Sequence, residues 1–379
     1  PHQFFQEQCK KTGIDLPEAG RYAVGNIFLP TGKDTRQGQE IMERAILTEG
    51  LELLGWRDVP VDNTTIGKTA RSVEPVIKQV FVGAGPSVKD QLAFERRLYC
   101  VRKRSAWGVR RAGLNENNES FYACSLSSKT LIYKGQLMAP QLESYYIDLQ
   151  DPNMVSALAL AHSRYSTNTF PSWGRAQPFR YIAHNGEINT VRGNKNWMNA
   201  RESMFESPSF DDINMILPVI APGGSDSADF DQALEMLFLT GRSLPHVMMM
   251  MIPEPWSGHE TMGDDKRGFY EFHASMMEPW DGPASIAFTD GETCGAVLDR
   301  NGLRPSRYYV TKDGMVVMAS EVGVLPIDEA NIEYKGRLQP GKMFLVDINE
   351  GRIISDEEIK SKISTQKPYT QWIKDNQVN

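Results

Sequence analysis

Two polar segments near the middle of the chain carry residue types that together could bind an amino acid. Arg164 follows an apolar run that begins at residue 157, and an arginine at the end of a strand can hold a carboxylate through two parallel hydrogen bonds. Asp226 stands where a loop is predicted to enter a helix, and its carboxylate can hold an ammonium group there. The pair therefore suits the zwitterionic head of an amino acid.

A third segment supplies the groups for an oxyanion hole. Asn185 and Gly186 follow the apolar run at residues 179–184. The side-chain amide of an asparagine and the unhindered backbone N–H of a glycine can both donate to the oxygen of a tetrahedral intermediate. With Arg164 and Asp226, this pair predicts a site that binds an amino acid and stabilises acyl transfer at its side-chain carbonyl.

Each of these residues also has a purely structural interpretation. Asn-Gly is a common turn dipeptide. Arg164 could belong to a buried ion pair, and Asp226 could merely cap its helix. Taken singly, each structural interpretation is at least as good as the functional one, but the conjunction of all four residues favours the site.

Three elements must position these side chains. We predict a strand at 157–164 before the arginine motif, a strand at 179–184 before Asn185, and a helix at 228–240. Asp226 and Ser227 offer N-caps for that helix, and Gly241 is a stop signal. Elsewhere the pattern predicts strands at 22–29 and 76–82 and helices at 37–54 and 90–111.

Composition excludes several function classes. The 41 Lys and Arg residues against 48 Asp and Glu residues give a net charge of −7, which disfavours a nucleic-acid partner. The basic run at 90–111 is therefore interpreted as a solvated helix face. The four methionines at 248–251 favour the core of a helix over a cofactor or docking surface. No apolar stretch is long enough to predict a membrane span.

The sequences of the polar segments resemble those of a known family. The chain is similar to the glutaminase domain of the class II, N-terminal-nucleophile amidotransferases, and more closely to that domain in glutamate synthases of the ferredoxin-dependent type. The likeness covers nearly the whole chain. It rests on the motifs HSRYSTNT at 162–169, HNGEINT at 184–190, GNKNWM at 193–198, EPWDGPA at 278–284 and LDRNGLRP at 298–305.

The resemblance implies a role for each site residue. Arg164 would bind the α-carboxylate of glutamine with the help of Thr167, and Asp226 would bind its α-amino group. Asn185 and Gly186 would form the oxyanion hole. The segment 299–305 would be architectural and hold a sheet next to the site.

The family's nucleophile, an N-terminal cysteine, has no match in this sequence. The chain begins at Pro1, and Cys9 lies in a helix-like run of polar residues. Cys100, Cys124 and Cys294 have the pattern of ordinary buried thiols. We therefore expect the N-terminal nucleophile segment to be missing and this segment alone to be inactive.

The resemblance implies an α+β, four-layer αββα N-terminal-nucleophile hydrolase fold with antiparallel sheets, whose first strand is absent here. Asp-Gly pairs at 290–291 and 313–314 each separate two β-type runs, which independently predicts antiparallel hairpins. Residues 343–348 and 352–354 form a third such pair. We predict one amidotransferase domain over residues 1–355 and a linker toward a further domain over 356–379.

Partners and cofactors follow from the resemblance as well. L-glutamine would be the substrate, and its ammonia would pass to a synthase domain of the same polypeptide that aminates 2-oxoglutarate. FMN and an iron–sulfur cluster, with ferredoxin as a possible donor, would serve that oxidoreductase domain in nitrogen assimilation. The four cysteines contain no C-x-x-C pair, so we expect no metal site in this segment and a reducing compartment, the cytoplasm or the plastid stroma.

Two alternatives stay open. The chain could be a non-catalytic glutamine-binding or scaffold domain that keeps the Arg164 and Asp226 site. It could also belong to another class II amidotransferase, such as a phosphoribosyl or sugar amidotransferase, with a different acceptor domain.

Overall fold

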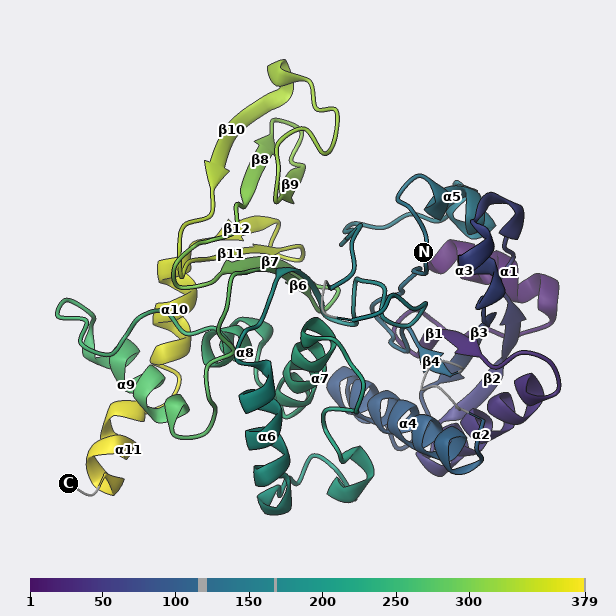
Figure 1. Cartoon of the computed structure of the whole chain (residues 1–379), viewed down its shortest axis with the longest axis horizontal. Helices are drawn as coiled ribbons and strands as arrows, with labels where there is room; N and C mark the ends of the chain where they lie inside the picture. Colours follow the sequence, from purple (N-terminus) through teal and green to yellow (C-terminus); the bar gives the residue numbers. More distant parts are fainter. Residues whose placement is uncertain (115–120, 167–168, 378–379) are drawn as a thin grey trace. The chain divides into compact units, whose positions relative to one another are not determined.

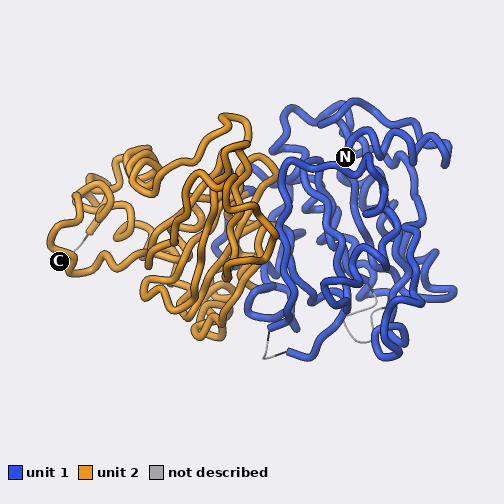
Figure 2. Tube along the Cα trace, turned by 90° about the horizontal axis from the view of Figure 1, so that it is seen from above, with its two compact units in different colours: residues 1–180, 202–228, 239–241 blue, residues 181–201, 229–238, 242–379 orange. Residues whose placement is uncertain are grey.

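The computed structural model describes residues 1–114, 121–166 and 169–377, and the chain forms two compact units (Figure 2). Unit 1 comprises residues 1–180, 202–228 and 239–241, and unit 2 comprises residues 181–201, 229–238 and 242–379. Helix α7 (Asp226–Leu239) contributes residues to both. Every named strand pair is antiparallel, and both units contain helices, so the predicted α+β class with antiparallel sheets is confirmed.

Unit 1 is built on a four-stranded sheet with the order β2-β3-β1-β4 (Figure 1). Helices α2 and α4 follow β1 and β3 along the chain, and the short helix α3 lies between β2 and β3. The strands are β1 (Tyr22–Leu29), β2 (Glu52–Asp58), β3 (Val76–Gly83) and β4 (Tyr122–Ala123). The helices are α1 (His2–Thr12), α2 (Asp34–Thr48), α3 (Lys68–Ser72), α4 (Gln91–Arg111) and α5 (Gln141–Tyr145), with 3-10 turns at Asn63–Thr65, Ile147–Gln150, Glu202–Met204 and Ile213–Ile216.

Strand β1 is buried along its whole length, and most of its residues are apolar. Ala23, Ile27 and Leu29 pack into one cluster with side chains of α2 and α4. Tyr22 and Val24 point to the other face and pack against α1. Both faces of the strand are therefore covered, and the predicted strands at 22–29 and 76–82 are confirmed as β1 and β3.

One predicted helix ends early. The helix expected at 37–54 stops at Thr48, because Gly50 adopts a φ of 67° and turns the chain into β2. The left-handed conformation at this position favours glycine.

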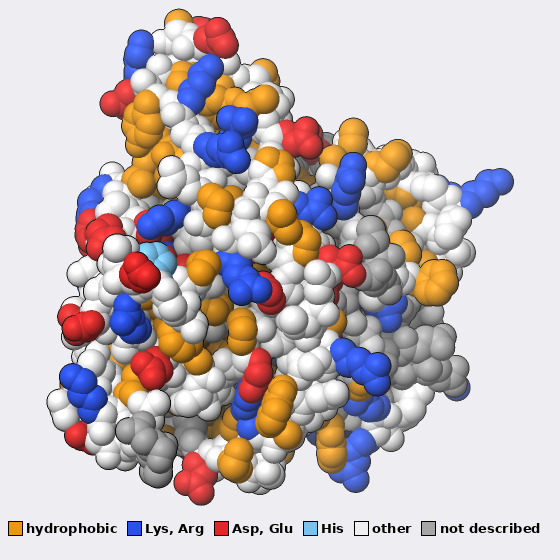
Figure 3. Space-filling model, turned by 60° about the vertical axis from the view of Figure 1, so that its left-hand side comes forward, with side chains coloured by type: hydrophobic (Ala, Val, Ile, Leu, Met, Phe, Trp, Pro, Cys, Tyr) orange, Lys and Arg blue, Asp and Glu red, His pale blue; other side chains and the backbone are white. Residues whose placement is uncertain are grey.

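We predicted that the basic helix α4 presents a solvated face. Several of its cations instead bind backbone carbonyls of other segments. Arg96 Nε donates to the carbonyl of Leu239 at 2.6 Å, and Arg97 Nη1 donates to that of Glu49 at 2.7 Å. Lys103 donates to two further backbone carbonyls. Leu239 and Glu49 lie at the ends of α7 and α2, where carbonyls lack intrahelical donors and attract cations. Figure 3 shows a different face, the left-hand side of Figure 1 brought forward, on which charged residues of both signs are interspersed.

Unit 2 contains two sheets. The five-stranded sheet has the order β12-β11-β7-β6-β5, and the three-stranded sheet has the order β10-β8-β9. The strands are β5 (Ile182–Gly186), β6 (Ala284–Thr289), β7 (Thr293–Leu298), β8 (Arg307–Thr311), β9 (Val316–Ala319), β10 (Ile332–Arg337), β11 (Met343–Asp347) and β12 (Arg352–Ile354). Its helices are α6 (Val191–Arg201), α8 (Leu244–Met251), α9 (Asp264–Ala274), α10 (Asp356–Ser364) and α11 (Tyr369–Asn376), with a 3-10 turn at Glu329–Asn331.

The hairpin predictions in this unit are confirmed. Strands β6 and β7 pair around Asp290-Gly291, and β8 and β9 pair around Asp313-Gly314. Strands β11 and β12 form the third pair. The methionines at 248–251 are all buried in α8, as expected for a helix core.

The segment that we expected to be a linker contains two helices, α10 (Asp356–Ser364) and α11 (Tyr369–Asn376). In Figure 1 its helices α10 and α11 lie beside α9. Trp372 and Tyr369 of α11 stack on Phe272 of α9, with ring centroids 5.2 and 5.3 Å apart. The domain boundary at residue 355 stays a prediction. No helix in the described part of the chain is long and apolar enough to span a membrane.

A buried histidine pair joins α8 to α9. The Nε2 atoms of His246 and His273 are 3.1 Å apart, and His273 Nδ1 donates to the carbonyl of Phe269 at 2.8 Å. The neutral His273 ring therefore accepts through Nε2, and His246 donates to it. Burial lowers the pKa of His246 to about 3 and that of His273 to about 4.

This pair should make unfolding pH-dependent. Because both pKa values are depressed on folding, the unfolded chain takes up protons first, and stability falls as the pH drops below about 6.5. Each histidine contributes roughly 2 kcal/mol of this loss at pH 5. His246→Gln keeps a donor to His273 and should remove about half of it. Urea unfolding at pH 7 and pH 5 measures the effect, with the exposed His259→Gln as control; an equal pH dependence in all three proteins would contradict it.

Candidate functional site

The arginine motif lies on irregular backbone in unit 1. Residues 157–164 form no helix or strand, so the predicted strand is wrong. The run alternates alanine and leucine and has no β-branched residue, which gives it little preference for a sheet. Arg164 is exposed, and its backbone N–H donates to His162 Nδ1 at 3.1 Å. Among the described residues, its guanidinium has no hydrogen-bond or ion-pair partner.

Asp226 contacts the arginine motif directly. Its Oδ1 accepts a hydrogen bond from Ser166 Oγ at 3.0 Å and one from Ser227 Oγ at 3.3 Å. Helix α7 begins at Asp226, and Ser225 Oγ accepts from the backbone N–H of Ala228 at 3.2 Å. Ser225 thus provides a side-chain cap one residue earlier than the caps that we predicted. The structure therefore brings the segments 162–166 and 225–227 together.

Arg175 fixes the loop that precedes Asp226, although no local sequence pattern marks this arginine. Its Nε and Nη2 atoms donate to the carbonyl of Gly223 at 3.2 and 3.1 Å, and Nη1 donates to that of Phe170 at 3.0 Å. Gly223 has a φ of 84°, which marks a sharp turn just before α7. Thr167, expected to assist Arg164, lies outside the described residues.

Asn185 and Gly186 end strand β5, which is the last strand of the five-stranded sheet as described. Glu187 donates to the carbonyl of Pro283 at 2.9 Å, so residues 187 and 283 form a hydrogen-bonded pair. In an antiparallel pair, the N–H groups of successive residues point alternately toward and away from the neighbouring strand. The N–H of Gly186 therefore points away from β6, toward the open edge of the sheet.

The other end of β5 agrees with this direction. Ile182 lies four residues before Gly186 on the same strand, so its N–H also points away from β6. This N–H donates to the carboxylate of Asp231 at 3.2 Å. Tyr181 donates to the same oxygen at 2.9 Å. Asp231 is buried, so these two bonds satisfy its Oδ1 atom. The outer edge of β5 is therefore held at its start by α7.

Gly186 is held by an exceptionally close backbone approach. Its φ is 148°, and a Cβ atom there would lie 1.8 Å from the carbonyl oxygen of Pro283. Gly282 has a φ of 153°, and its Cβ would lie 2.0 Å from the carbonyl oxygen of Glu187. Only glycine fits at either position. The two glycines clamp the end of β5 onto the start of β6.

The side chain of Asn185 is half-buried, and among the described residues of unit 2 its amide has no hydrogen-bond partner. An amide donor and an outward N–H from adjacent residues therefore stand at one strand end. This arrangement can donate two hydrogen bonds to a ligand oxygen.

Asp299 organises the backbone behind this strand end. Its Oδ2 atom accepts from the N–H groups of Ala284 at 3.0 Å and Leu303 at 3.3 Å, and its Oδ1 accepts from Asn301 at 2.9 Å. The side chain is buried. The contact to Ala284 fixes the residue after the Gly282–Pro283 pair, as expected for an architectural segment.

The motifs at 184–190, 193–198 and 278–284 are also joined. Thr190 Oγ1 accepts from the N–H of Asp281 at 2.9 Å and bonds Asn194 Oδ1 at 2.7 Å. Asn194 Nδ2 donates to the carbonyl of Pro279 at 3.1 Å. These contacts tie the start of α6 to the segment that holds Gly186.

None of the four thiols has the environment of an activated nucleophile. Burial raises the pKa of Cys9 to about 11 and those of Cys100 and Cys124 to about 12. Burial also raises the pKa of Cys294. Reactive cysteines have lowered pKa values and accessible sulfur atoms. No group of three His, Cys, Asp or Glu side chains in the described residues could hold a metal ion.

Comparisons with known proteins agree with one another. The family model of glutamine amidotransferases class-II matches residues 1–372. The glutamate synthase [NADPH] large chain of Bacillus subtilis (strain 168) is 52% identical over 381 residues, covering 100% of this chain and 24% of that protein. The ferredoxin-dependent glutamate synthase 1 of Arabidopsis thaliana is 43% identical over 99% of this chain and 23% of its own length. The chain thus spans about a quarter of these relatives.

Among solved structures, a glutamine phosphoribosylpyrophosphate amidotransferase from B. subtilis covers 88% of this chain and 49% of its own, with 15% identity and a TM-score of 0.27. That likeness is too low to support an argument about the site.

Gly186→Ala tests the close backbone approach. The added methyl group meets a backbone oxygen rather than a flexible side chain, so the start of β6 or the end of β5 must move. We expect a loss of roughly 2–4 kcal/mol in the free energy of unfolding, measured with urea. Gly193→Ala in α6 is the control, because its Cβ has no atom within 4 Å, and it should stabilise by up to about 1 kcal/mol. Equal stabilities of the two variants would refute the clamp.

Proposed function

Since the chain belongs to the class-II glutamine amidotransferases, we propose that it forms the glutamine site of a glutamate synthase and takes part in hydrolysing L-glutamine to glutamate and ammonia. The single observation that carries this proposal is the strand end of β5. There an outward backbone N–H and an amide without a partner in unit 2 come from adjacent residues, Gly186 and Asn185.

We assign the amino-acid head of glutamine to unit 1. Arg164 would bind the α-carboxylate with Thr167, and Asp226 would bind the α-ammonium group. The exposed guanidinium of Arg164 supports the first role. The bond from Ser166 to Asp226 supports the second, because it holds the carboxylate beside the arginine motif.

We assign the reacting carbonyl to Asn185 and Gly186. A thiolate attacks the side-chain amide carbon, and the two donors stabilise the negative oxygen that forms. The C–N bond then breaks, ammonia leaves with a proton, and water hydrolyses the thioester to glutamate. The attacking sulfur is none of the four thiols of this chain, whose burial and raised pKa values oppose ionisation.

The rest of the proposed enzyme follows from the relatives. Their names span three electron donors: NADPH and NADH in proteins 52% and 47% identical to the chain, and ferredoxin in one 43% identical. We propose that ammonia passes to a synthase domain that aminates 2-oxoglutarate with FMN and an iron–sulfur cluster. The described residues of this chain offer no ligand set for the cluster, so we assign the cluster to another segment. The proposed compartment is the cytoplasm or the plastid stroma.

Asp226→Asn tests the substrate site. Removing the negative charge should raise the KM for glutamine about tenfold to a hundredfold in the full-length protein, because a charge-assisted hydrogen bond is lost. The exposed Asp211→Asn is the matched control and should not change KM. An unchanged KM in the Asp226 variant would remove its assigned role.

The thiol assignment is tested by alanine at Cys9, Cys100, Cys124 and Cys294 in turn. Each variant of the full-length protein should keep its glutaminase kcat, because the attacking sulfur lies elsewhere. Purified chain 1–379 should hydrolyse no glutamine for the same reason. Ammonia release in a coupled assay measures both, and turnover by the purified chain would overturn the assignment.

A further inference from the structure

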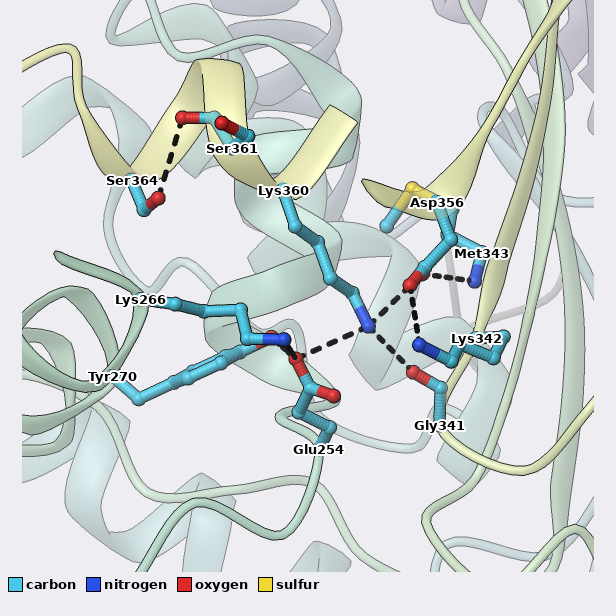
Figure 4. A network of polar contacts seen from close by, with 10 residues as sticks. All are labelled: Glu254, Lys266, Tyr270, Gly341, Lys342, Met343, Asp356, Lys360, Ser361 and Ser364. Carbon is cyan, nitrogen blue, oxygen red and sulfur yellow. Dashed lines mark hydrogen bonds and ion pairs between the residues drawn. The ribbon is translucent and has the colours of Figure 1, made fainter. Parts of the chain in front are cut away.

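A buried lysine of the C-terminal helix α10 lies at the centre of a polar network in unit 2 (Figure 4). Lys360 is 2% exposed. Its ammonium group donates to the carbonyl of Gly341 at 2.8 Å and pairs with Asp356 Oδ1 at 2.9 Å and Glu254 Oε1 at 3.3 Å. An ammonium group is costly to bury unless each of its three donors is satisfied, as they are here.

Helix α10 also binds the two residues after Gly341, namely Lys342 and Met343. Residues 341–343 lead from a turn into strand β11. Asp356 accepts from Lys342 Nζ at 2.9 Å and from the backbone N–H of Met343 at 2.8 Å. Although burial opposes its ionisation, Lys360 and Lys342 bring the pKa of Asp356 below its ordinary value. Helix α10 therefore contacts three consecutive residues, Gly341, Lys342 and Met343, through two charged side chains (Figure 4).

Gly341 also supports Asp299. Gly341 donates its N–H to the carbonyl of Asp299 at 3.0 Å, and the carboxylate of Asp299 accepts from the N–H of Ala284 at 3.0 Å. Ala284 follows Pro283, whose carbonyl oxygen accepts from Glu187 and lies against Gly186. A continuous series of short contacts thus runs from α10 to the end of β5.

We propose that Lys360 is a positioning residue for the oxyanion hole: it fixes the turn at 341–343, and through Asp299 that turn fixes Gly186 and Asn185. This inference rests on the proposed function. It also makes α10 part of the catalytic unit, although the sequence predicted a linker from residue 356.

The electrostatics of the network fit this role. Glu254 accepts from Tyr270 Oη at 3.1 Å and pairs with Lys266 at 3.3 Å, so its carboxylate is held from α9 as well as from α10. Loss of the Lys360 charge leaves two half-buried carboxylates, those of Glu254 and Asp356, with one cation fewer. The carbonyl of Gly341 also loses its donor, so the turn is free to move.

Lys360→Met in the full-length protein tests the proposal, with Lys362→Met, an exposed lysine of the same helix, as control. The Lys360 variant should lower the glutaminase kcat about tenfold to a hundredfold, because small displacements of catalytic donors have such effects. The KM for glutamine should not change, because Arg164 and Asp226 do not depend on this network. Hydrogen exchange should quicken at residues 184–188 and 282–287 and stay unchanged in strand β1 of unit 1.

The variant Asn185→Ala distinguishes a failure of the positioning role from a failure of the proposed function. If it lowers kcat but Lys360→Met behaves like Lys362→Met, the positioning role is overturned and the proposed function stands. If exchange quickens in β1 as well and KM rises, Lys360 has a general structural role and the inference is overturned. If Asn185→Ala keeps full activity, the proposed oxyanion hole fails, and the inference fails with it.

Discussion

The geometry of the proposed oxyanion hole depends on one close contact between two backbone segments. The carbonyl oxygen of Pro283 and the Cα atom of Gly186 leave no room for a side chain, and Gly282 approaches Glu187 in the same way. Because this contact fixes the register of β5 on β6, it also decides which edge each N–H faces. The outward direction of the Gly186 N–H follows from this one register.

Charged side chains that are buried or half-buried support both units by binding backbone groups. In unit 2, Asp231 and Asp299 accept backbone N–H groups at the two ends of the β5–β6 pair. In unit 1, Arg96 and Arg97 donate to carbonyls at the ends of two other helices. Such bonds satisfy groups that secondary structure leaves without a partner. They explain how a chain with many internal charges builds ordered loops around a polar site.

The sequence predicted the hairpins and strand β1 well, because Asp-Gly turns and apolar runs act locally. It placed the start of α7 at residue 228, whereas the helix begins at Asp226 and Ser225 provides a side-chain cap. The sequence placed the arginine motif and Asp226 in one site, and the Ser166 bond brings these two segments together. The roles assigned to Asn185 and Gly186 stay predictions. The sequence did not predict the irregular backbone at 157–164. The roles of Arg175, of the α4 cations and of Lys360 were also missed. Those roles depend on carbonyls that are distant in sequence, so no local pattern marks them.

The most direct measurement is a crystal structure of the full-length protein with a glutamine-derived inhibitor that forms a tetrahedral adduct on the catalytic thiol. The account predicts that the adduct oxygen lies about 2.7–3.1 Å from both the backbone nitrogen of Gly186 and the side-chain nitrogen of Asn185. An adduct whose oxygen contacts neither nitrogen would contradict the assignment of this strand end as the oxyanion hole.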